Sequence, residues 1–355
     1  MAIAFDTFTA FRDHGFDTLI DVRAPSEYAE DHVPGAISLP VLSDAERARV
    51  GTIYKQVSAF DARKIGAALV ARNAATHIEG ALAGHDGGWR PLVYCWRGGQ
   101  RSNAFASILT QIGWRAGVVE GGYRSYRRAV KAMLYDQPFP CPVVLLDGNT
   151  GTAKTELLHL ARDRGVQILD LEGLANHRGS LFGAMGDQPA QKGFESRLAD
   201  AVAALTPGRP VLVEAESSKV GQRVVPPSLW SAMGRARRIE LRVPPEARAS
   251  YLTRTYADIV ADTPRLMQTL SALVRLQGHD RVARWKDLAM AGAHETLALE
   301  LMRDHYDPRY GRERGAPDRL AVIEAATLDA DGLARAADRI AALMHGLAAQ
   351  AVPDR

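Results

Sequence analysis

Apolar runs alternate with helical segments through the first part of the chain. Residues 18–23, 91–93 and 117–119 are short, largely apolar runs, which are typical of buried strands. Residues 43–85 are rich in Ala, Arg and Lys, and residues 104–112 carry apolar side chains at helical spacing, so helices are predicted there. Strands that alternate with helices predict a parallel sheet with helices on both faces.

The second part of the chain repeats this alternation and then becomes mainly helical. Residues 143–147 and 211–217 are apolar runs that predict buried strands. A helical run follows the first of them at residues 156–160. From residue 245 onward the pattern is mainly helical and rich in Ala, Leu and Arg. This half is therefore also predicted to be α/β, with a helical C-terminal part.

A proline-rich segment separates the two halves. Residues 137–142 hold three prolines at alternate positions, which favours an extended, semi-rigid linker. The flanking parts are then two domains, 1–136 and 143–355. A chain of 355 residues with 46% hydrophobic residues has room for two domains of ordinary size with their own cores.

Charge and cysteine content narrow the functional classes. The formal net charge is +3, with 24% charged residues, so nucleic-acid binding is permitted but not indicated. The chain has two cysteines, Cys95 and Cys141, which excludes a disulfide scaffold and fits a reducing compartment. The first residues lack the apolar core of a signal peptide, and no apolar run is long enough to span a membrane. We therefore expect a cytoplasmic protein that does not bind membranes.

The first candidate site is the loop that follows Cys95, between a predicted strand and a predicted helix. This loop consists of Trp96, Arg97, Gly98, Gly99, Gln100 and Arg101. Glycines allow a tight curl, and inward N–H groups, a helix N-terminus and arginines all favour negative charge. A thiol in this setting ionises easily, so Cys95 is predicted to be a nucleophile. The alternative of a buried structural cysteine fits Cys141 in the linker better, because glycines and arginines are poor core residues.

The second candidate site is a glycine-rich loop between the strand at 143–147 and the following helix. It consists of Gly148, Asn149, Thr150, Gly151, Thr152, Ala153, Lys154 and Thr155. A phosphate-binding loop requires this context, in which backbone N–H groups hold a di- or triphosphate, Lys154 contacts its outer oxygens and Thr155 ligates Mg²⁺. Ala153 departs from the usual pattern, which has glycine there. The alternative is a glycine-rich turn that only opens a helix.

Two other segments are candidates for contact with the same ligand. The strand at 211–217 ends in Glu214 and Glu216, and in phosphate-loop folds such an acid contacts the metal or its water. A strand end with solvated acids is the alternative. Residues 170–180 and 188–192 are rich in small and polar side chains, which fits a ligand-facing loop and a solvated surface loop almost equally.

Basic side chains gather in two stretches. The first is Arg124, Arg127, Arg128 and Lys131, and the second is Arg235, Arg237, Arg238 and Arg242. Spacings of three and four place the first group on one face of a predicted helix. Each group is a candidate surface for a phosphate backbone, and a solvated helix face is the alternative.

Several local motifs resemble known families. Residues 21–23 and 32–36, together with the Cys95 loop, resemble a rhodanese domain, in which the cysteine carries sulfur or selenium covalently. A phosphate-loop domain after a rhodanese domain is a rare pairing. In addition, the chain resembles bacterial tRNA 2-selenouridine synthases at residues 94–99, 121–123, 170–175, 177–180 and 305–308. This implies a rhodanese-like parallel sheet with flanking helices, followed by a P-loop NTPase-like α/β domain with a helical C-terminal region.

The resemblance implies a tRNA-modifying transferase that replaces the sulfur of wobble 2-thiouridine with selenium from selenophosphate. It also implies an earlier S-geranylation by geranyl diphosphate, because a geranyl thioether leaves more readily than the sulfur itself. Lys154, with Mg²⁺, would stabilise the departing diphosphate. The phosphate loop then holds either a prenyl diphosphate or a nucleotide, since both end in a diphosphate. The anticodon region of tRNA is the implied partner, with the two basic stretches as candidate contacts.

Further partners and cofactors follow from the same resemblance. A selenophosphate-producing enzyme is the expected donor partner, and no redox cofactor is expected. Two other classes of function remain open on the residues alone. Cys95 and Arg101 have the Cys-x5-Arg spacing of cysteine-dependent phosphatases, although that activity gives the second domain no role. The second open class is a binding module without catalysis, in which the phosphate loop is a nucleotide-gated switch.

Overall fold

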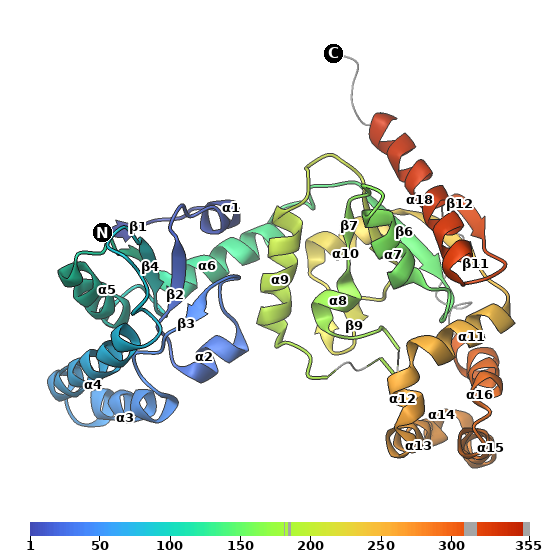
Figure 1. The fold of residues 1–355 in the computed structure, drawn as a ribbon, viewed down its shortest axis with the longest axis horizontal. Coiled ribbons are helices and arrows are strands. Elements are labelled where there is room, and N and C mark those ends of the chain that lie inside the picture. The colour runs from blue at the N-terminus through green and yellow to red at the C-terminus, as the bar shows by residue number, and fades with distance from the viewer. Residues whose placement is uncertain (181, 184–185, 309–317, 351–355) are drawn as a thin grey trace. The chain divides into compact units, whose positions relative to one another are not determined.

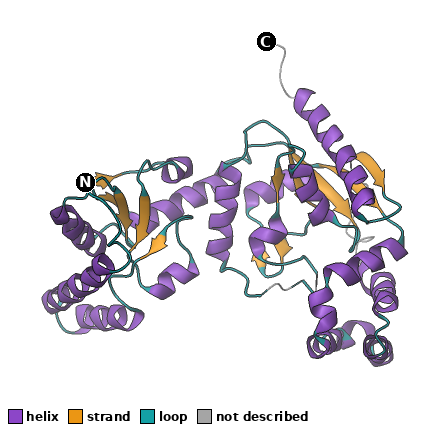
Figure 2. Ribbon diagram, viewed as in Figure 1, coloured by secondary structure: helices purple, strands orange, loops and turns teal. Residues whose placement is uncertain are grey.

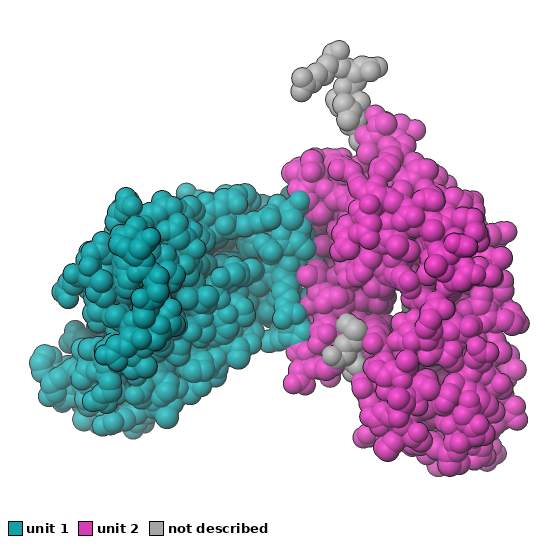
Figure 3. Space-filling view, in the orientation of Figure 1, with its two compact units in different colours: residues 1–138, 189–204 teal, residues 139–188, 205–355 magenta. Residues whose placement is uncertain are grey.

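The computed structural model describes residues 1–355 except 181, 184–185, 309–317 and 351–355 (Figure 1). The chain forms two compact units, residues 1–138 with 189–204 and residues 139–188 with 205–355 (Figure 3). Their boundary falls inside the expected linker. Residues 189–204, which the sequence places in the second domain, belong to the first unit. The reason is that α9 (Gln191–Ala203) contacts α1 (Phe8–Arg12) and α6 (Gly122–Lys131).

The first unit is built on a five-stranded sheet in which all neighbouring strands are parallel. The strands, in spatial order, are β1 (Ala2–Ile3), β5 (Gly117–Val119), β4 (Pro91–Tyr94), β2 (Thr18–Asp21) and β3 (Ile37–Ser38). Every residue of β4 is buried, as expected for a central strand with helices on both faces. The predicted fold class of this half is confirmed.

Local signals set the helices of the first unit. The segment 43–85, predicted to be helical, forms α3 (Asp44–Gln56) and α4 (Ala59–Glu79). The break between them arises because Ser58 begins a second helix by accepting a hydrogen bond from the backbone N–H of Asp61. The remaining helical elements are α2 (Pro25–Glu30), α5 (Gln100–Ile112) and the π-helical turn η1 (Ala132–Asp136).

The second unit also contains a five-stranded parallel sheet, flanked by helices (Figure 2). In spatial order its strands are β12 (Arg319–Glu324), β11 (Arg237–Arg242), β6 (Val143–Gly148), β8 (Val211–Glu214) and β7 (Ile168–Leu169). Helices α7 (Lys154–Arg162) and α18 (Ala330–Gln350) share a hydrophobic core with β6 and β11. The phosphate-loop architecture expected for this half is confirmed.

Smaller elements complete the sheet region of the second unit. These are α8 (Leu171–Ala175), the antiparallel pair β9 (Lys219–Val220) and β10 (Arg223–Val224), and α10 (Pro227–Gly234). The second basic stretch lies largely on a strand, because Arg237, Arg238 and Arg242 belong to β11.

A helical region follows β11 and has a hydrophobic cluster of its own around Trp285. It consists of α11 (Pro245–Thr255), α12 (Ala257–Ala261), α13 (Thr263–Ser271), α14 (Val274–Gln277), α15 (His279–Met290), α16 (His294–Leu301) and the π-helical turn η2 (Met302–Tyr306). Among the helices that the structure describes, none combines the length and apolarity that a membrane span requires.

Candidate active sites

The Cys95 loop connects β4 to α5, as the sequence predicts. Its curl depends on two glycines with positive φ. A Cβ on Gly98 (φ 65°) would lie 2.4 Å from the carbonyl oxygen of Val119, and one on Gly122 (φ 57°) would lie 2.2 Å from that of Cys95. The start of α6 holds the loop, since the backbone N–H of Tyr123 donates to the Cys95 carbonyl at 2.8 Å. Glycine is therefore required at both positions.

The thiol of Cys95 is buried and hydrogen-bonded. Ser102 Oγ, in the first turn of α5, donates to Cys95 Sγ at 3.2 Å. Burial acts to raise the pKa of Cys95, but the hydrogen bonds from Ser102 and the charge of Arg101 outweigh it, so the pKa is lowered. A lowered pKa favours the thiolate, which is the nucleophilic form. Sequence reasoning named Cys95 but gave Ser102 no part in its activation.

Arg101 does not stand free beside the thiol. Its guanidinium donates to Glu27 Oε2 at 2.9 Å, and Glu27 lies on α2. Burial raises the pKa of Glu27, but the hydrogen bond and charge of Arg101 more than compensate, so that pKa is lowered. A phosphate clamp, as in the phosphatase interpretation, would require Arg101 to leave this ion pair.

A buried polar network supports the Cys95 loop. Arg23 pairs with Asp21 at 2.6 Å, and its guanidinium also donates to the Asp31 carbonyl at 2.6 Å. The guanidinium carbon of Arg23 lies 3.9 Å from the ring centroid of Tyr123, whose hydroxyl donates to Asp31 Oδ2 at 2.6 Å. Because Tyr123 also binds the Cys95 backbone, the network links the motif at residues 21–23 to the loop.

The other cysteine has a different environment. Cys141 is buried, and its Sγ donates weakly to the Thr206 carbonyl at 3.4 Å. Burial raises its pKa. Cys141 therefore remains protonated, and its surroundings are those of a structural residue.

The second candidate site is the loop from Gly148 to Thr155, which connects β6 to α7. Ala153 adopts the left-handed conformation (φ 60°, ψ 31°) that glycine has in the usual pattern. An alanine there costs about 1–2 kcal/mol of backbone strain, yet the loop geometry is retained. Lys154 Nζ donates to the Gly148 carbonyl at 2.9 Å, inside the loop. The departure at Ala153 therefore leaves the strand–loop–helix arrangement intact.

A buried arginine clamps the backbone of the phosphate loop. Arg248 Nε, on α11, donates to the Thr150 carbonyl at 2.9 Å. The two terminal nitrogens of Arg248 bind Asp307 at 3.0 and 2.7 Å. The motif at residues 305–308 thus acts on the phosphate loop through Arg248. The sequence does not mark these contacts of Arg248, because Thr150 and Asp307 lie far away from it along the chain.

A cavity of about 970 Å³ lies over the phosphate loop. Lys154, Thr155 and other loop residues line it, as do Asp170, Glu172 and Gly173 from the segment predicted to face a ligand. His159 also lines this cavity and lies 2.7 Å from Asp170 through Nε2 and Oδ2. Part of the segment 170–180 therefore lines the cavity, and contact with a ligand there stays a prediction.

Carboxylates gather beside Lys154. Thr155 Oγ1 donates to Glu172 Oε2 at 2.8 Å, and Glu216 lines the same cavity. Burial and the charge of Glu172 raise the pKa of Glu216 to about 8. Burial also raises the pKa of Glu172, against the opposing charge of Lys154. The sequence singled out Glu216 as a candidate acid, whereas it marked Glu172 only as part of the ligand-facing segment 170–180.

Glu214 has a structural position. It is fully buried, and its Oε2 accepts a hydrogen bond from the Leu171 N–H at 3.0 Å. Burial raises the pKa of Glu214 well above its ordinary value, and neighbouring carboxylates add to the effect. Glu214 is not among the residues that line the cavity, so of the two predicted acids Glu216 is the one placed to meet a ligand.

Comparison with known proteins gives two domain matches and several similar relatives. The chain matches the tRNA 2-selenouridine synthase AAA domain over residues 141–327 and the rhodanese-like domain over residues 6–129. The tRNA 2-selenouridine synthase of Chromohalobacter salexigens is 36% identical over 323 residues, 82% of this chain and 86% of the relative. The chain belongs to the tRNA 2-selenouridine synthase family.

Two other synthases of this family show similar coverage. That of Pseudomonas syringae pv. syringae is 34% identical over 83% of this chain and 88% of its own length. That of Bordetella bronchiseptica is 35% identical over 84% of this chain and 88% of its own length. The similarity therefore spans both units rather than one of them.

The basic residues predicted from the sequence separate into exposed and engaged groups. On α6, Arg124, Arg128 and Lys131 are exposed. Arg127 is instead half-buried, and its guanidinium pairs with Glu195 and with Asp31. The helical spacing is correct, but α9 covers the Arg127 position and supplies a partner.

The second basic stretch separates in the same way. Arg235 and Arg237 are exposed. Arg238 lines the phosphate cavity and pairs with Asp147 at 3.1 Å. Arg238 is therefore placed toward a ligand in the cavity rather than on an outer surface.

Proposed function

We propose that this protein converts wobble 2-thiouridine of tRNA to 2-selenouridine, with selenophosphate as the selenium donor and an S-geranylated intermediate made from geranyl diphosphate. The observation that carries the proposal is family membership over both units. The two sites supply different chemistry, a thiol of lowered pKa in the first unit and a phosphate loop in the second. A two-step reaction uses both.

The first step is alkylation of the thiocarbonyl sulfur. That sulfur attacks the first carbon of geranyl diphosphate, the carbon–oxygen bond breaks, and diphosphate leaves as the uridine loses its N3 proton. Charge then builds up on the diphosphate, where Lys154 and the N–H groups of the phosphate loop stabilise it. We assign this step to the second unit.

Mg²⁺ is part of this proposal, and the residues fit it. Mg²⁺ in phosphate sites is usually held by one or two carboxylates together with the substrate's phosphates. The Thr155 hydroxyl and the side chains of Glu172 and Glu216 would supply such ligands beside Lys154, and Mg²⁺ would displace the protons that their raised pKa values favour. Within the described part of the chain, no larger group of acidic, histidine or cysteine side chains is able to hold a metal alone. Bound Mg²⁺ would neutralise diphosphate charge.

The second step is replacement of the thioether by selenium. Selenium bonds to C2, geranyl thiol leaves, and water takes the phosphoryl group of selenophosphate as phosphate. No oxidant or reductant is needed, because selenium in selenophosphate is already at the level of a selenide. We assign this step to Cys95: its thiolate, which the lowered pKa favours, attacks C2 and expels geranyl thiolate, and selenium from selenophosphate then displaces the Cys95 sulfur from C2.

Nucleoside analysis tests the proposal. Purified protein is incubated with 2-thiouridine tRNA, geranyl diphosphate and selenophosphate, and the wobble nucleosides are measured by mass spectrometry. We expect geranylated nucleoside without selenophosphate and 2-selenouridine with it. Recovery of unchanged 2-thiouridine in both reactions would overturn the proposal. We also propose the cytoplasm as its compartment and a selenophosphate-producing enzyme as donor partner, since the tRNA and a free thiol are both maintained there.

A further inference from the structure

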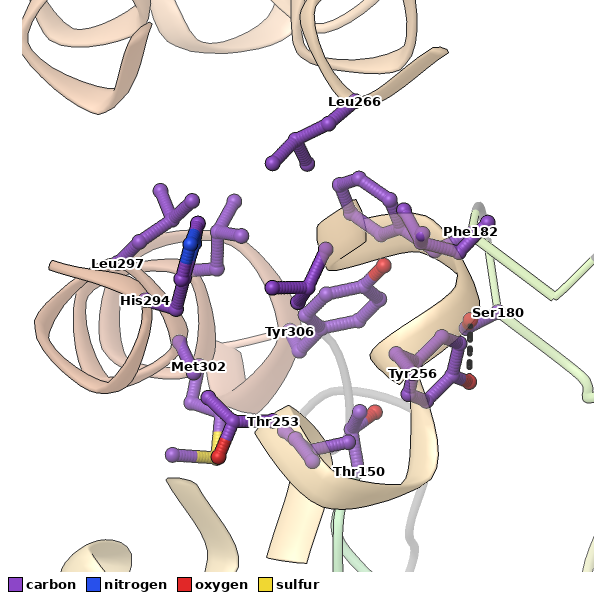
Figure 4. Close-up of a pocket in the computed structure, with 15 residues that line it drawn as sticks. Thr150, Ser180, Phe182, Thr253, Tyr256, Leu266, His294, Leu297, Met302 and Tyr306 are labelled. Atoms are coloured by element: carbon purple, nitrogen blue, oxygen red, sulfur yellow. Dashed lines mark hydrogen bonds between the residues drawn. The ribbon is translucent and has the colours of Figure 1, made fainter. Parts of the chain in front are cut away.

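A second, smaller cavity lies beside the phosphate loop. Its volume is about 80 Å³, and its exposed walls are almost entirely apolar. Side chains from α11, α12, α13, α16 and η2 converge on it (Figure 4). Leu252, Ile259, Val260, Leu266 and Leu297 form much of the lining. No part of the reaction as described so far uses this space.

The small cavity shares a wall with the phosphate site. Thr150, a phosphate-loop residue, lines both cavities, and so do Ser180, Leu252, Tyr256 and Tyr306. Ser180 and Tyr256 are hydrogen-bonded at 3.0 Å along this shared wall (Figure 4). A ligand held at the phosphate loop therefore has an apolar space within reach of its other end.

We propose that the small cavity binds the far end of the hydrocarbon chain of a prenyl diphosphate whose diphosphate lies on the phosphate loop. This inference rests on the proposed function and names the pocket that its first substrate requires. It also decides between the two ligands that the phosphate loop itself leaves open, a prenyl diphosphate and a nucleotide.

The chemistry of the walls favours a hydrocarbon over a nucleoside. A base or sugar placed among Val260, Leu266 and Leu297 would lose its hydrogen bonds to water without replacement. A hydrocarbon loses nothing there, and each buried methylene tightens binding about fourfold.

The volume limits how much of the chain enters. A cavity of about 150 Å³ holds a benzene molecule, so one of 80 Å³ takes roughly half as many carbons. That space suits the branched end of the chain only. The part next to the diphosphate would then lie along the shared wall formed by Leu252 and Tyr256. A chain that is too short to pass this wall gains nothing from the cavity.

Chain length and one cavity-filling variant test the assignment. The probes are inorganic diphosphate, dimethylallyl diphosphate and geranyl diphosphate, each titrated calorimetrically into the full-length protein. Val260→Phe fills the cavity from its partly buried wall. Val274→Phe is the matched control, because Val274 packs on the same helical cluster but lines neither cavity.

We expect the unmodified protein to bind geranyl diphosphate at least tenfold more tightly than the dimethylallyl ester. Val260→Phe should reduce geranyl diphosphate affinity to that of the shorter ester and leave inorganic diphosphate affinity unchanged. Val274→Phe should behave as the unmodified protein. The chain-length comparison needs no variant, so it tests the inference even where Val260→Phe fails to fold.

Three outcomes would overturn the inference: no preference for the longer chain, unchanged geranyl diphosphate affinity in folded Val260→Phe, or an equal loss of inorganic diphosphate affinity in that variant. Geranyl transfer to tRNA is assayed in parallel. If folded Val260→Phe transfers geranyl as fast as the unmodified protein, the small cavity does not bind the hydrocarbon chain, but the proposed function stands. If binding of prenyl diphosphates depends on chain length but no geranyl is transferred to tRNA, the proposed first step is wrong, and the assignment of the small cavity stands.

Discussion

The reactivity of single residues depends on the neighbours that the fold provides. Cys95 receives a hydrogen bond from Ser102 and has a lowered pKa, whereas buried Cys141 has a raised one. Lys154 lies within the phosphate loop and Glu216 lines the cavity beside it. The same residue types therefore serve different purposes at different positions.

Cys95→Ser should abolish selenium incorporation and leave geranylation intact, so that geranylated tRNA accumulates. Serine does not ionise at neutral pH and therefore does not replace the thiolate. The measurement is mass spectrometry of wobble nucleosides after reaction with both substrates. Cys141→Ser is the matched control and should retain both products. Loss of both products in a folded Cys95→Ser protein would contradict this division of labour.

Lys154→Ala should slow geranyl transfer about 30- to 1000-fold. This corresponds to a loss of roughly 2–4 kcal/mol of transition-state stabilisation. The reason is that its ammonium group no longer meets the charge on the departing diphosphate. Transfer to tRNA is measured with purified variant, and alkylation of Cys95 by iodoacetamide should stay unchanged. Lys219→Ala, which removes another cavity-lining lysine outside the loop, is the control. Full transfer activity in Lys154→Ala would show that the loop does not bind the reacting diphosphate.

At the level of elements, helices and strands decide which charges remain available. Helix α6 exposes Arg124 and Arg128, while Arg127 turns toward α9 and pairs with Glu195. Arg238, on strand β11, lines the large cavity over the phosphate loop. Exposed cations on α6 are therefore the candidates for tRNA phosphates, and Arg127 is better explained as part of the packing of α9.

Charge reversal at Arg124 and Arg128 together should weaken tRNA binding and lower its salt dependence, because contacts with phosphates release counterions. The slope of log affinity against log salt should fall by about 1.5 if both contact phosphates. Arg63→Glu with Arg72→Glu, on exposed positions of α4, is a control with the same change in charge. An unchanged salt slope in the α6 variant would show that this face is only solvated.

At the level of the whole molecule, each unit has its own hydrophobic core. Phe105 and Leu109 belong to the core beside the Cys95 loop, and Leu157 and Ile340 belong to the core beside the phosphate loop. Each core positions one reactive loop at the carboxyl end of a central strand, β4 or β6. Stability of the second unit is in addition linked to pH through its buried carboxylates.

Glu216→Gln should stabilise the protein at pH 8 and have little effect at pH 5. The pKa of Glu216 is about 8 in the folded protein, against an ordinary value of 4.5 that applies to the unfolded chain. Between pH 4.5 and pH 8 the folded state therefore binds one more proton than the unfolded state. Stability therefore falls as pH rises through that window, and the variant loses this dependence. Urea unfolding should show a gain at pH 8 exceeding that at pH 5 by about 1 kcal/mol or more. An equal gain in stability at pH 5 and pH 8 would contradict this prediction. The same pH-dependent gain in Glu156→Gln, at an exposed position, would also contradict it.

The sequence by itself determined the local chemistry of this protein. The Cys95 loop and the loop ending at Thr155 were both predicted correctly as strand–loop–helix segments. The strand, the glycine-rich turn and the helix of each segment lie next to one another along the chain, so these short-range preferences are visible in a single sequence. Contacts from α6 and from Arg248 then hold the two loops. Even Ala153 keeps the left-handed conformation that the loop imposes.

Only the tertiary structure decided which distant side chains meet. Arg248 clamps the carbonyl of Thr150 and binds Asp307, and the three are far apart along the chain. The pairing of Arg127 with Glu195 likewise depends on α9 packing in the first unit. The apolar cavity is formed by helices whose periodicity shows only that each has a buried face. Which buried faces meet, and what space they leave, depends on packing between elements, which local sequence preferences do not specify.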